Sequence, residues 1–315
     1  MRIICMGAGG LGGFYGALLA GTKNEVGFVA RGAHLAAMRA EGLTIERDGG
    51  RESLHLPNPR LADNPAELGP ADLVILGTKL WDTEAAIAAI EPVMQPGGFV
   101  VSLQNGVTKD DALRAAFGPD RVLGGVAYIA AAIAQPGVIR QTGTMQRLVL
   151  GGYAPAGQAM AERLAEAATV GGIETVLPPD ITVAIWQKFV FLVGMSSMTA
   201  AARSSIGPIR QTHLSRAFLA DLFAEVVAVG QALGVALPMD EAQAAMTRTD
   251  AVPPTMTTSM HHDLERGSRL ELPWLAGTVV ELGHKAGVAT PCARAMLAVL
   301  APFAGGRRPA PLAEV

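Results

Sequence analysis

The N-terminal third of the chain alternates between short, continuously apolar segments and segments in which apolar positions recur with helical spacing. Four apolar segments have the length of strands: 2–6, 25–30, 72–79 and 98–106. Three segments of helical pattern lie between them: 14–21, 33–40 and 83–94. Strands without polar alternation are typical of sheets that are covered on both faces, and the order strand–helix–strand predicts βαβ units with a parallel sheet.

The pattern changes twice further along the chain. Residues 121–151 contain apolar segments separated by Pro-Gly and Thr-Gly, which predict further strands, and a helical pattern follows at 157–168. The sequence LPPD at 177–180 marks a boundary, because consecutive prolines stop regular structure. Beyond it, helical spacing recurs in four segments: 181–202, 212–234, 272–287 and 292–303. We therefore expect an α/β domain over 1–177 and an all-helical domain over 178–315.

Composition and charge exclude several classes of protein. Of the 315 residues, 50% are hydrophobic and 17% are charged, which is typical of a globular chain. The formal net charge is -3 and no run of basic residues occurs, so neither nucleic acid nor an anionic membrane surface is an expected partner. Of the longest uncharged stretches, 122–139 is interrupted by glycine and proline, and 189–202 is too short to span a bilayer.

Cysteine usage and the N-terminus indicate where the protein works. Cys5 and Cys292 are far apart in the sequence and have no metal-binding spacing, so neither a disulfide framework nor a metal site is predicted. The chain enters its first apolar strand directly, without the basic and apolar regions of a signal peptide. We therefore expect a soluble protein of the cytoplasm.

A glycine-rich loop, GAGGLG, follows the first strand and precedes the first helical segment. Its first glycine allows a tight turn, its second lets the backbone approach a pyrophosphate, and its third permits close packing of helix on strand. The helix N-terminus would also offer unpaired N–H groups and a positive dipole to phosphates. The loop therefore predicts dinucleotide binding through six residues: Gly7, Ala8, Gly9, Gly10, Leu11 and Gly12. The alternative is a glycine-rich turn without a ligand.

The end of the second strand favours NADP(H) over NAD(H). An NAD site would place an acidic residue there to hold the ribose 2′-hydroxyl, whereas this chain has Val29-Ala30-Arg31-Gly32. Arg31 could pair with a 2′-phosphate, because a guanidinium fits phosphate geometry well. The alternative is a solvated surface arginine.

Three further polar residues stand out against apolar surroundings. Lys79 and Asn105 follow two of the predicted strands, and ligands of open α/β sheets bind at the carboxyl ends of strands. Asn105 could hydrogen-bond the nicotinamide ribose or the substrate, although an ordinary Asn-Gly turn is the alternative. Lys188 heads the run WQKFVFLVGMSSMTA at 186–200. A buried ammonium is costly unless it is paired, so Lys188 either reaches the surface or has a function.

These motifs together resemble the ketopantoate reductase (2-dehydropantoate 2-reductase) family over roughly residues 1–300. The resemblance rests on GAGGLG, TK at 78–79, QNG at 104–106, Lys188, and SMHHDLERGSRLE at 259–271. It implies an N-terminal Rossmann domain that binds NADPH and a helical domain like the C-terminal domain of 6-phosphogluconate dehydrogenase. It further implies an NADP-dependent oxidoreductase of pantothenate biosynthesis with a small 2-oxo acid substrate. Homodimer formation is left open.

The resemblance also implies roles in catalysis. Lys188 matches the general acid of the family, and an ammonium near a developing alkoxide would stabilise its charge and could supply the proton. Glu271 matches the carboxylate that orients this lysine and holds a hydroxyl of substrate or ribose. Ser259 matches the serine that binds the substrate carboxylate, although a serine before a helix is also an ordinary N-cap.

The chain departs from the family where asparagines usually contact the substrate: Leu192 and Ser196 follow Lys188 by one and two helical turns, and Ile206 precedes Gly207. A pocket without hydroxyl-binding groups discriminates weakly for hydroxylated substrates. Reduction of a more apolar 2-oxo acid or ketone on the same scaffold is therefore the alternative to reduction of ketopantoate. A non-catalytic NADP(H)-sensing protein is the rival of another class, and the presence of both Lys188 and Glu271 argues against it.

Overall fold

The computed structural model describes residues 1–306 and divides into two compact units, Met1–Ala184 and Ile185–Val315. The division lies within a long helix, α6 (Ile181–Ala202), and not at the predicted boundary after residue 177. The first turn of α6 belongs to the first unit because Ile181 lies against Gly124 and Gly151 there.

The first unit holds all strands of the described chain, in the order given by its sequence. The strands are β1 (Arg2–Met6), β2 (Glu25–Val29), β3 (Leu43–Glu46), β4 (Leu54–Leu56), β5 (Arg60–Ala62), β6 (Ala71–Leu76), β7 (Met94–Ser102), β8 (Val122–Gln135), β9 (Val138–Gly152) and β10 (Glu174–Val176). The helices of this unit are α1 (Gly10–Ala20), α2 (Gly32–Glu41), α3 (Thr83–Ile90), α4 (Lys109–Phe117) and α5 (Pro155–Val170).

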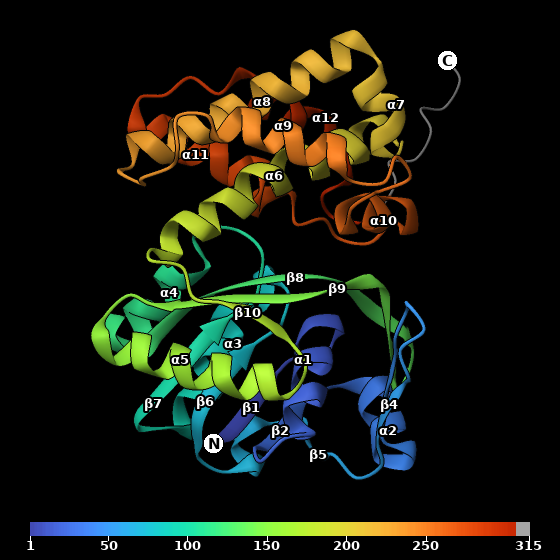
Figure 1. The fold of residues 1–315 in the computed structure, drawn as a ribbon, viewed down its shortest axis with the longest axis vertical. Helices are drawn as coiled ribbons and strands as arrows, with labels where there is room; N and C mark the ends of the chain where they lie inside the picture. Colours follow the sequence, from blue (N-terminus) through green and yellow to red (C-terminus); the bar gives the residue numbers. More distant parts are fainter. Residues whose placement is uncertain (307–315) are drawn as a thin grey trace. The chain divides into compact units, whose positions relative to one another are not determined.

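The strands form one mixed sheet with the order β4-β3-β9-β8-β7-β6-β1-β2-β5, and β10 pairs with β9 (Figure 1). The part from β5 to β8 is parallel, as the alternating pattern predicts. The segments predicted only as further strands form one long antiparallel hairpin, β8–β9. The sheet is therefore mixed as a whole, because a short Pro-Gly turn can join antiparallel neighbours only, while its parallel part is the one that the alternating pattern predicts.

Alternate residues of the central strands enter two separate cores. Ile3 and Cys5 of β1 pack in a cluster with α1, α2 and α5, whereas Ile4 and Met6 pack in a cluster with α3 and α4. Helices thus cover both faces of the parallel strands, which explains why these strands read as uninterrupted apolar runs. The predicted α/β fold of the N-terminal half is confirmed.

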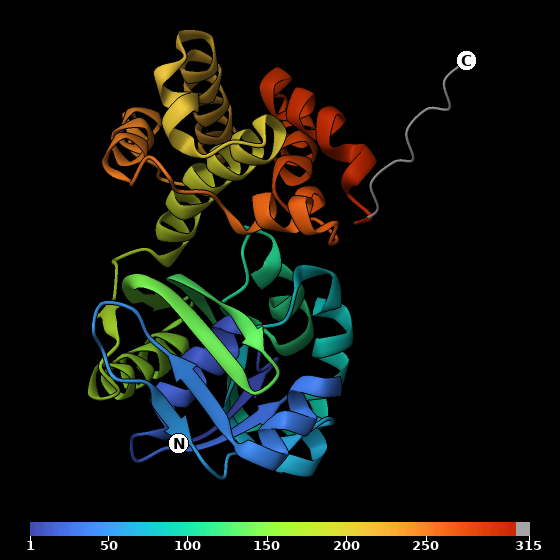
Figure 2. The same ribbon diagram turned by 90° about the vertical axis from the view of Figure 1, so that its right-hand side faces the viewer.

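The second unit is helical throughout its described part, as expected (Figure 2). Its helices after α6 are α7 (Ile206–Gln211), α8 (His213–Ala232), α9 (Glu241–Ala251), α10 (Ser259–Arg266), α11 (Ala276–Ala286) and α12 (Pro291–Leu300). Helix α6 packs on α8, where the rings of Phe191 and Phe223 stack with centroids 6.4 Å apart. Gly194 and Gly230 permit the close approach, because a Cβ there would lie 2.2 Å from Phe223 and 2.8 Å from Trp186.

Helix α6 has the predicted bounds, 181–202, and is therefore longer than the uncharged stretch 189–202 that lies within it. It comprises 22 residues and includes Lys188, so by length and composition it could cross a bilayer. However, 61% of its most apolar window is buried inside the protein, as in the core helices of globular domains.

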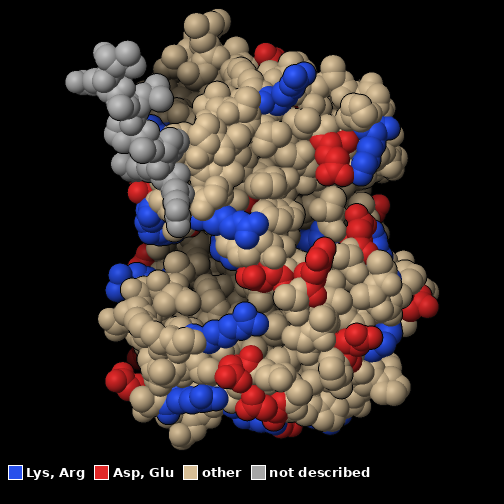
Figure 3. Space-filling view, turned by 180° about the vertical axis from the view of Figure 1, so that it is seen from behind, with Lys and Arg blue, Asp and Glu red and all other residues tan. Residues whose placement is uncertain are grey.

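The surface carries charges of both signs: on the face in Figure 3, basic and acidic side chains are interspersed.

Candidate active site

The glycine loop connects β1 to α1 at the carboxyl end of the parallel strands. Gly7 has φ +96°, in the left-handed region that favours glycine, and a Cβ there would lie 2.9 Å from the Thr78 side chain. Gly7 is therefore needed both for the turn and for the close approach of the loop after β6. The Ala8 N–H donates to Val29 O at 2.8 Å, which ties the same loop to the end of β2.

The two following glycines of the motif have opposite surroundings. A Cβ on Gly12 would lie 2.2 Å from the carbonyl oxygen of Gly7, so no side chain fits where α1 meets β1. A Cβ on Gly9 would meet no protein atom within 4 Å, and Gly9 has an ordinary extended φ of -78°. The fold therefore does not require glycine at position 9. The open space above Gly9, at the N-terminus of α1, fits the close approach of a pyrophosphate.

Arg31 is the N-cap residue of α2, directly after β2. Its side chain is exposed and makes no hydrogen bond or ion pair within residues 1–306, so it is available to a phosphate. His34, which the sequence analysis did not single out, lies in the first turn of the same helix. Its Nδ1 accepts the Gly137 N–H at 3.0 Å, and its Nε2 therefore carries the hydrogen donated to Ala8 O at 2.9 Å.

His34 thus joins the glycine loop to the turn of the β8–β9 hairpin in its neutral form. Burial lowers the pKa of His34, although the hydrogen bond to the Ala8 carbonyl partly opposes this. Sequence alone offered no signal for this bridge, because Gly137 lies 103 residues away from His34.

Gln104 organises the ends of β6 and β7. Its side chain is 4% exposed, and its Nε2 donates to Thr83 Oγ1 at 2.9 Å and to Lys79 O at 3.2 Å. Its Oε1 accepts from the Ser102 hydroxyl at 3.0 Å. Gln104 therefore holds the loop that carries Lys79 beside the loop that carries Asn105.

The predicted cofactor residues of the first unit share one edge of the sheet. Strands β1, β2, β6 and β7 are mutually parallel, so their carboxyl ends lie along the same edge. The residues that follow these ends are the glycine loop, Arg31, Lys79 and Asn105. Lys79 is exposed, with its Nζ 5.8 Å from the Trp81 ring centroid, and Asn105 is half-buried. This edge is where open α/β sheets bind their ligands.

A buried ion pair that the sequence analysis missed lies below this edge. Lys109 is 4% exposed, and its Nζ donates to Ser102 O at 2.6 Å and to Gly125 O at 3.0 Å. Asp110 lies 3.4 Å from Lys109 Nζ and accepts the Tyr153 hydroxyl at 2.7 Å. Burial lowers the pKa of Lys109, and Asp110 opposes the effect. The pair fixes the start of α4 to the strands.

In the second unit, α6 presents Lys188, Leu192 and Ser196 at intervals of four residues, which places them along one side of the helix. Lys188 and Leu192 are half-buried, whereas Ser196 is fully buried. The Ser196 hydroxyl has no hydrogen-bond partner in the described chain. The Ser197 hydroxyl is in the same state, and both oxygens are closed to solvent.

The segment 258–271 carries the remaining predicted residues. Thr258, not Ser259, is the N-cap of α10, and its hydroxyl accepts the His261 N–H at 3.3 Å. Ser259 is exposed, and its hydroxyl makes no hydrogen bond within the described residues. Glu271 precedes a short 3₁₀ helix and is 5% exposed. Ile206 is fully buried at the start of α7.

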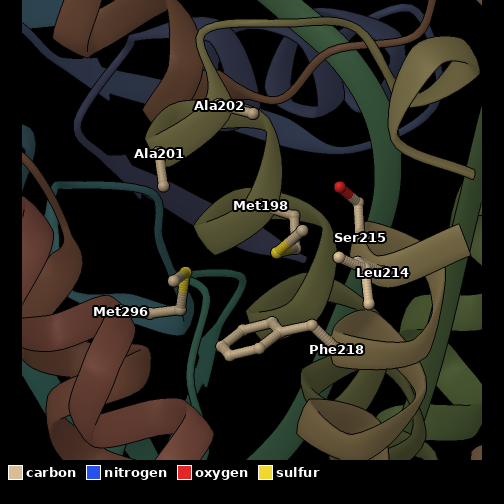
Figure 4. A pocket seen from close by; sticks show the side chains of 7 residues that line it. All are labelled: Met198, Ala201, Ala202, Leu214, Ser215, Phe218 and Met296. Carbon is tan, nitrogen blue, oxygen red and sulfur yellow. The ribbon is translucent and has the colours of Figure 1, made fainter. Parts of the chain in front are cut away.

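A pocket of about 250 Å³ opens on the second unit between α6, α8 and α12 (Figure 4). Met198, Phe218 and Met296 point into it, and its walls carry no charged residue. None of the predicted site residues lines it, so this pocket is not the candidate active site.

Comparison with known proteins decides the family. The model of "Ketopantoate reductase PanE/ApbA" matches residues 3–155, and the model of its C-terminal part matches residues 180–304. The chain belongs to the ketopantoate reductase family. It is 32% identical over 324 aligned residues to the 2-dehydropantoate 2-reductase of Mesorhizobium japonicum, with 95% of this chain and 97% of that protein covered.

Solved structures agree with this assignment. A ketopantoate reductase from Ralstonia eutropha superposes with a TM-score of 0.87 at 30% identity, covering 96% of this chain and 98% of that one. A D-mandelate dehydrogenase, solved with NADH and anilino(oxo)acetate, has the same fold, with a TM-score of 0.88 at 20% identity and coverage of 96% and 98%.

Membership of the ketopantoate reductase family confirms several predictions. The family, the two-part fold and the enzyme class, an NADP-dependent oxidoreductase, are those expected from the motifs. The roles of individual site residues stay predictions.

Proposed function

We propose that the protein uses NADPH to reduce 2-dehydropantoate to pantoate, a step of pantothenate biosynthesis. The observation that carries the proposal is the carboxyl edge of β1, β2, β6 and β7, where the glycine loop, Arg31, Lys79 and Asn105 come together. Relatives across nearly the whole chain that are named 2-dehydropantoate 2-reductase support the choice of substrate.

The residues of this edge suit NADPH. The space above Gly9 would receive the pyrophosphate, with the free N–H groups of the first turn of α1 facing it. Arg31 would bind the 2′-phosphate from the start of α2, because it is exposed and has no competing partner in the described residues. Asn105 would hold the nicotinamide ribose or the substrate. Bound NADPH supplies the hydride that the reduction of a ketone requires.

The helical unit would supply the proton and hold the substrate. Lys188 would protonate the carbonyl oxygen as it gains negative charge, and its ammonium would stabilise that charge. Glu271, which is buried, would orient Lys188. Ser259 suits the substrate carboxylate, because Thr258 takes the capping position and leaves the Ser259 hydroxyl exposed.

A second candidate function is the reduction of a more apolar 2-oxo acid. The observation that favours it is Leu192, an aliphatic side chain on the same side of α6 as Lys188, where the resemblance predicts a polar one. A pocket lined by leucine cannot bond the terminal hydroxyl of 2-dehydropantoate and gains from an alkyl substituent.

The test is NADPH oxidation measured with 2-dehydropantoate and with 2-oxoisovalerate, which lacks the terminal hydroxymethyl group. A higher kcat/KM for 2-dehydropantoate supports the first proposal, and a higher value for 2-oxoisovalerate supports the second. Tight NADPH binding without turnover of any 2-oxo acid would leave an NADP(H)-sensing role instead.

The variant Leu192→Asn tests whether this position faces the substrate. It should raise the ratio of kcat/KM for 2-dehydropantoate over 2-oxoisovalerate, because an unpaired buried amide costs about 1–3 kcal/mol unless the substrate satisfies it. Leu214→Asn, at a side chain on α8 that is 78% exposed, is the matched control and should leave the ratio unchanged. Ser196 is less suitable, since it is fully buried and a larger residue would overpack the core.

A further inference from the structure

Two adjacent histidines on α10 and a glutamate one turn later form a cluster that the proposed reaction does not use. The donor atoms of His261, His262 and Glu265 all lie within 4.8 Å of one another. The His261 side chain is 6% exposed, whereas those of His262 and Glu265 are 52% and 56% exposed. The cluster is therefore anchored at one ligand and open to solvent at the other two.

The hydrogen bonds of the cluster determine which nitrogens face Glu265. His261 Nδ1 lies 2.9 Å from the carbonyl oxygen of Thr199, which can only accept, so Nδ1 carries the hydrogen. In the neutral ring His261 Nε2 then presents a lone pair towards Glu265. His262 Nε2 lies 2.9 Å from Thr257 Oγ1, which leaves Nδ1 facing the same carboxylate.

This arrangement has the outer hydrogen bonding of a metal site. Histidine ligands of metals almost always donate their second N–H to a carbonyl or carboxylate, which fixes the ring and its tautomer. The Thr199 carbonyl, at the end of α6, does this for His261, whereas the Thr257 hydroxyl beside His262 Nε2 can either accept or donate.

The spacing of the donor atoms also suits a cation. Metal–ligand bonds of about 2.1 Å at tetrahedral angles place neighbouring ligand atoms about 3.4 Å apart. His261 Nε2 lies 3.3 Å from Glu265 Oε1, and His262 Nδ1 lies 3.7 Å from Glu265 Oε2. In the neutral ring, His261 Nε2 and Glu265 Oε1 are two lone-pair atoms that repel at this distance unless a proton or a metal ion lies between them.

We propose that His261 Nε2, His262 Nδ1 and the Glu265 carboxylate form a binding site for a divalent transition-metal ion of the Zn²⁺ class. Imidazole nitrogens with one carboxylate are ligands that Zn²⁺ accepts, and three protein ligands leave a coordination position for water. The site lies wholly within the helical unit and stands independently of the proposed reductase function.

Zn²⁺ titration of the full-length protein, prepared without a histidine tag and freed of metal, tests the proposal. We expect one Zn²⁺ per chain by isothermal titration calorimetry or by competition with a chromophoric chelator. His262→Gln and Glu265→Gln should each weaken Kd by about tenfold or more, because even outer partners of metal ligands contribute 10–100-fold. Both side chains are half exposed, so these variants should fold normally.

His284→Gln, at an exposed histidine in the last turn of α11, is the matched control and should leave Kd within about twofold of wild type. Binding should weaken as the pH falls, since the ligand histidines must be neutral. Equal Kd values for the wild type and the two cluster variants would overturn the site. The site would also be overturned if Zn²⁺ did not bind and NMR spectra showed that His261 is protonated at neutral pH. The cluster would then be an ion pair.

Discussion

Replacing Gly9 with alanine should separate cofactor binding from folding. The added methyl group would meet no protein atom within 4 Å and would point into the space proposed for the pyrophosphate. Loss of one charge-assisted hydrogen bond costs about 1.5–3 kcal/mol. Since about 1.4 kcal/mol corresponds to a factor of ten, Kd for NADPH should rise by roughly 10–100-fold.

The stability of the ligand-free Gly9→Ala protein should hardly change, because two small effects oppose each other. The φ of -78° is open to alanine, which would stabilise by about 0.4–1 kcal/mol through the unfolded chain. Gly9 is also the N-cap of α1, where alanine is worse than glycine by a similar amount. The free energy of unfolding, measured by denaturant titration, should therefore stay within about 1 kcal/mol of wild type.

Two further glycines of the same helix provide the comparison. Gly12→Ala should destabilise the fold, because its Cβ would lie 2.2 Å from a backbone oxygen. Gly21 lies at the far end of α1, where a Cβ would have its nearest neighbour at 3.4 Å. Gly21→Ala should therefore change neither the stability nor the affinity for NADPH much. NADPH binding is measured by fluorescence titration. If Gly9→Ala binds NADPH as tightly as wild type, the space above Gly9 is not the pyrophosphate site.

Four other outcomes follow from the structure. Arg31→Ala should weaken the binding of NADPH by about 1–3 kcal/mol and leave the binding of NADH nearly unchanged. Equal losses of affinity in the two titrations would show that Arg31 does not bind the 2′-phosphate. Lys188→Ala should lower kcat by roughly 10²–10⁴-fold at unchanged NADPH affinity, whereas a variant that keeps most of its turnover would make Lys188 a surface lysine. Lys109→Met should lower the free energy of unfolding in urea by about 3–5 kcal/mol, because it leaves buried Asp110 without its cation. An unchanged free energy of unfolding would contradict that reasoning. Burial lowers the pKa of His34 in the folded protein below its value of about 6.5 in the unfolded chain. The contribution of neutral His34 to the free energy of unfolding is therefore complete above about pH 6.5, and it is lost as the pH falls from there through the lower folded pKa. Tm measured from pH 8 to pH 5 should therefore fall more steeply in wild type than in His34→Gln, and parallel curves would argue against the bridge.

The local sequence was sufficient to predict the elements whose buried positions follow a simple repeat along the chain. The apolar runs of β1, β2, β6 and β7 have no polar alternation because helices cover both of their faces. Helix α6 was predicted with its observed bounds, Ile181–Ala202, because its apolar positions recur over its whole length. Short edge strands such as β4 and β5 were missed, since three residues carry too little pattern to recognise.

Some residues of the candidate site could likewise be predicted from the sequence, whereas others could not. Gly7, Gly9 and Gly12 could be recognised because one loop between a strand and a helix carries all three. The sequence alone therefore determined the alternation of the main strands and helices in the N-terminal third, the glycine loop, the family resemblance and the isolated Lys188.

Only the tertiary structure decided which distant groups meet. His34 contacts Gly137 across 103 residues, and the His261 ring contacts Thr199 across 62 residues. The burial of Lys109 and the mixed pairing of β8 with β9 likewise depend on where several elements pack. Sequence patterns report the local repeat of a single element, whereas these contacts depend on packing between elements, so they could not be read along the chain.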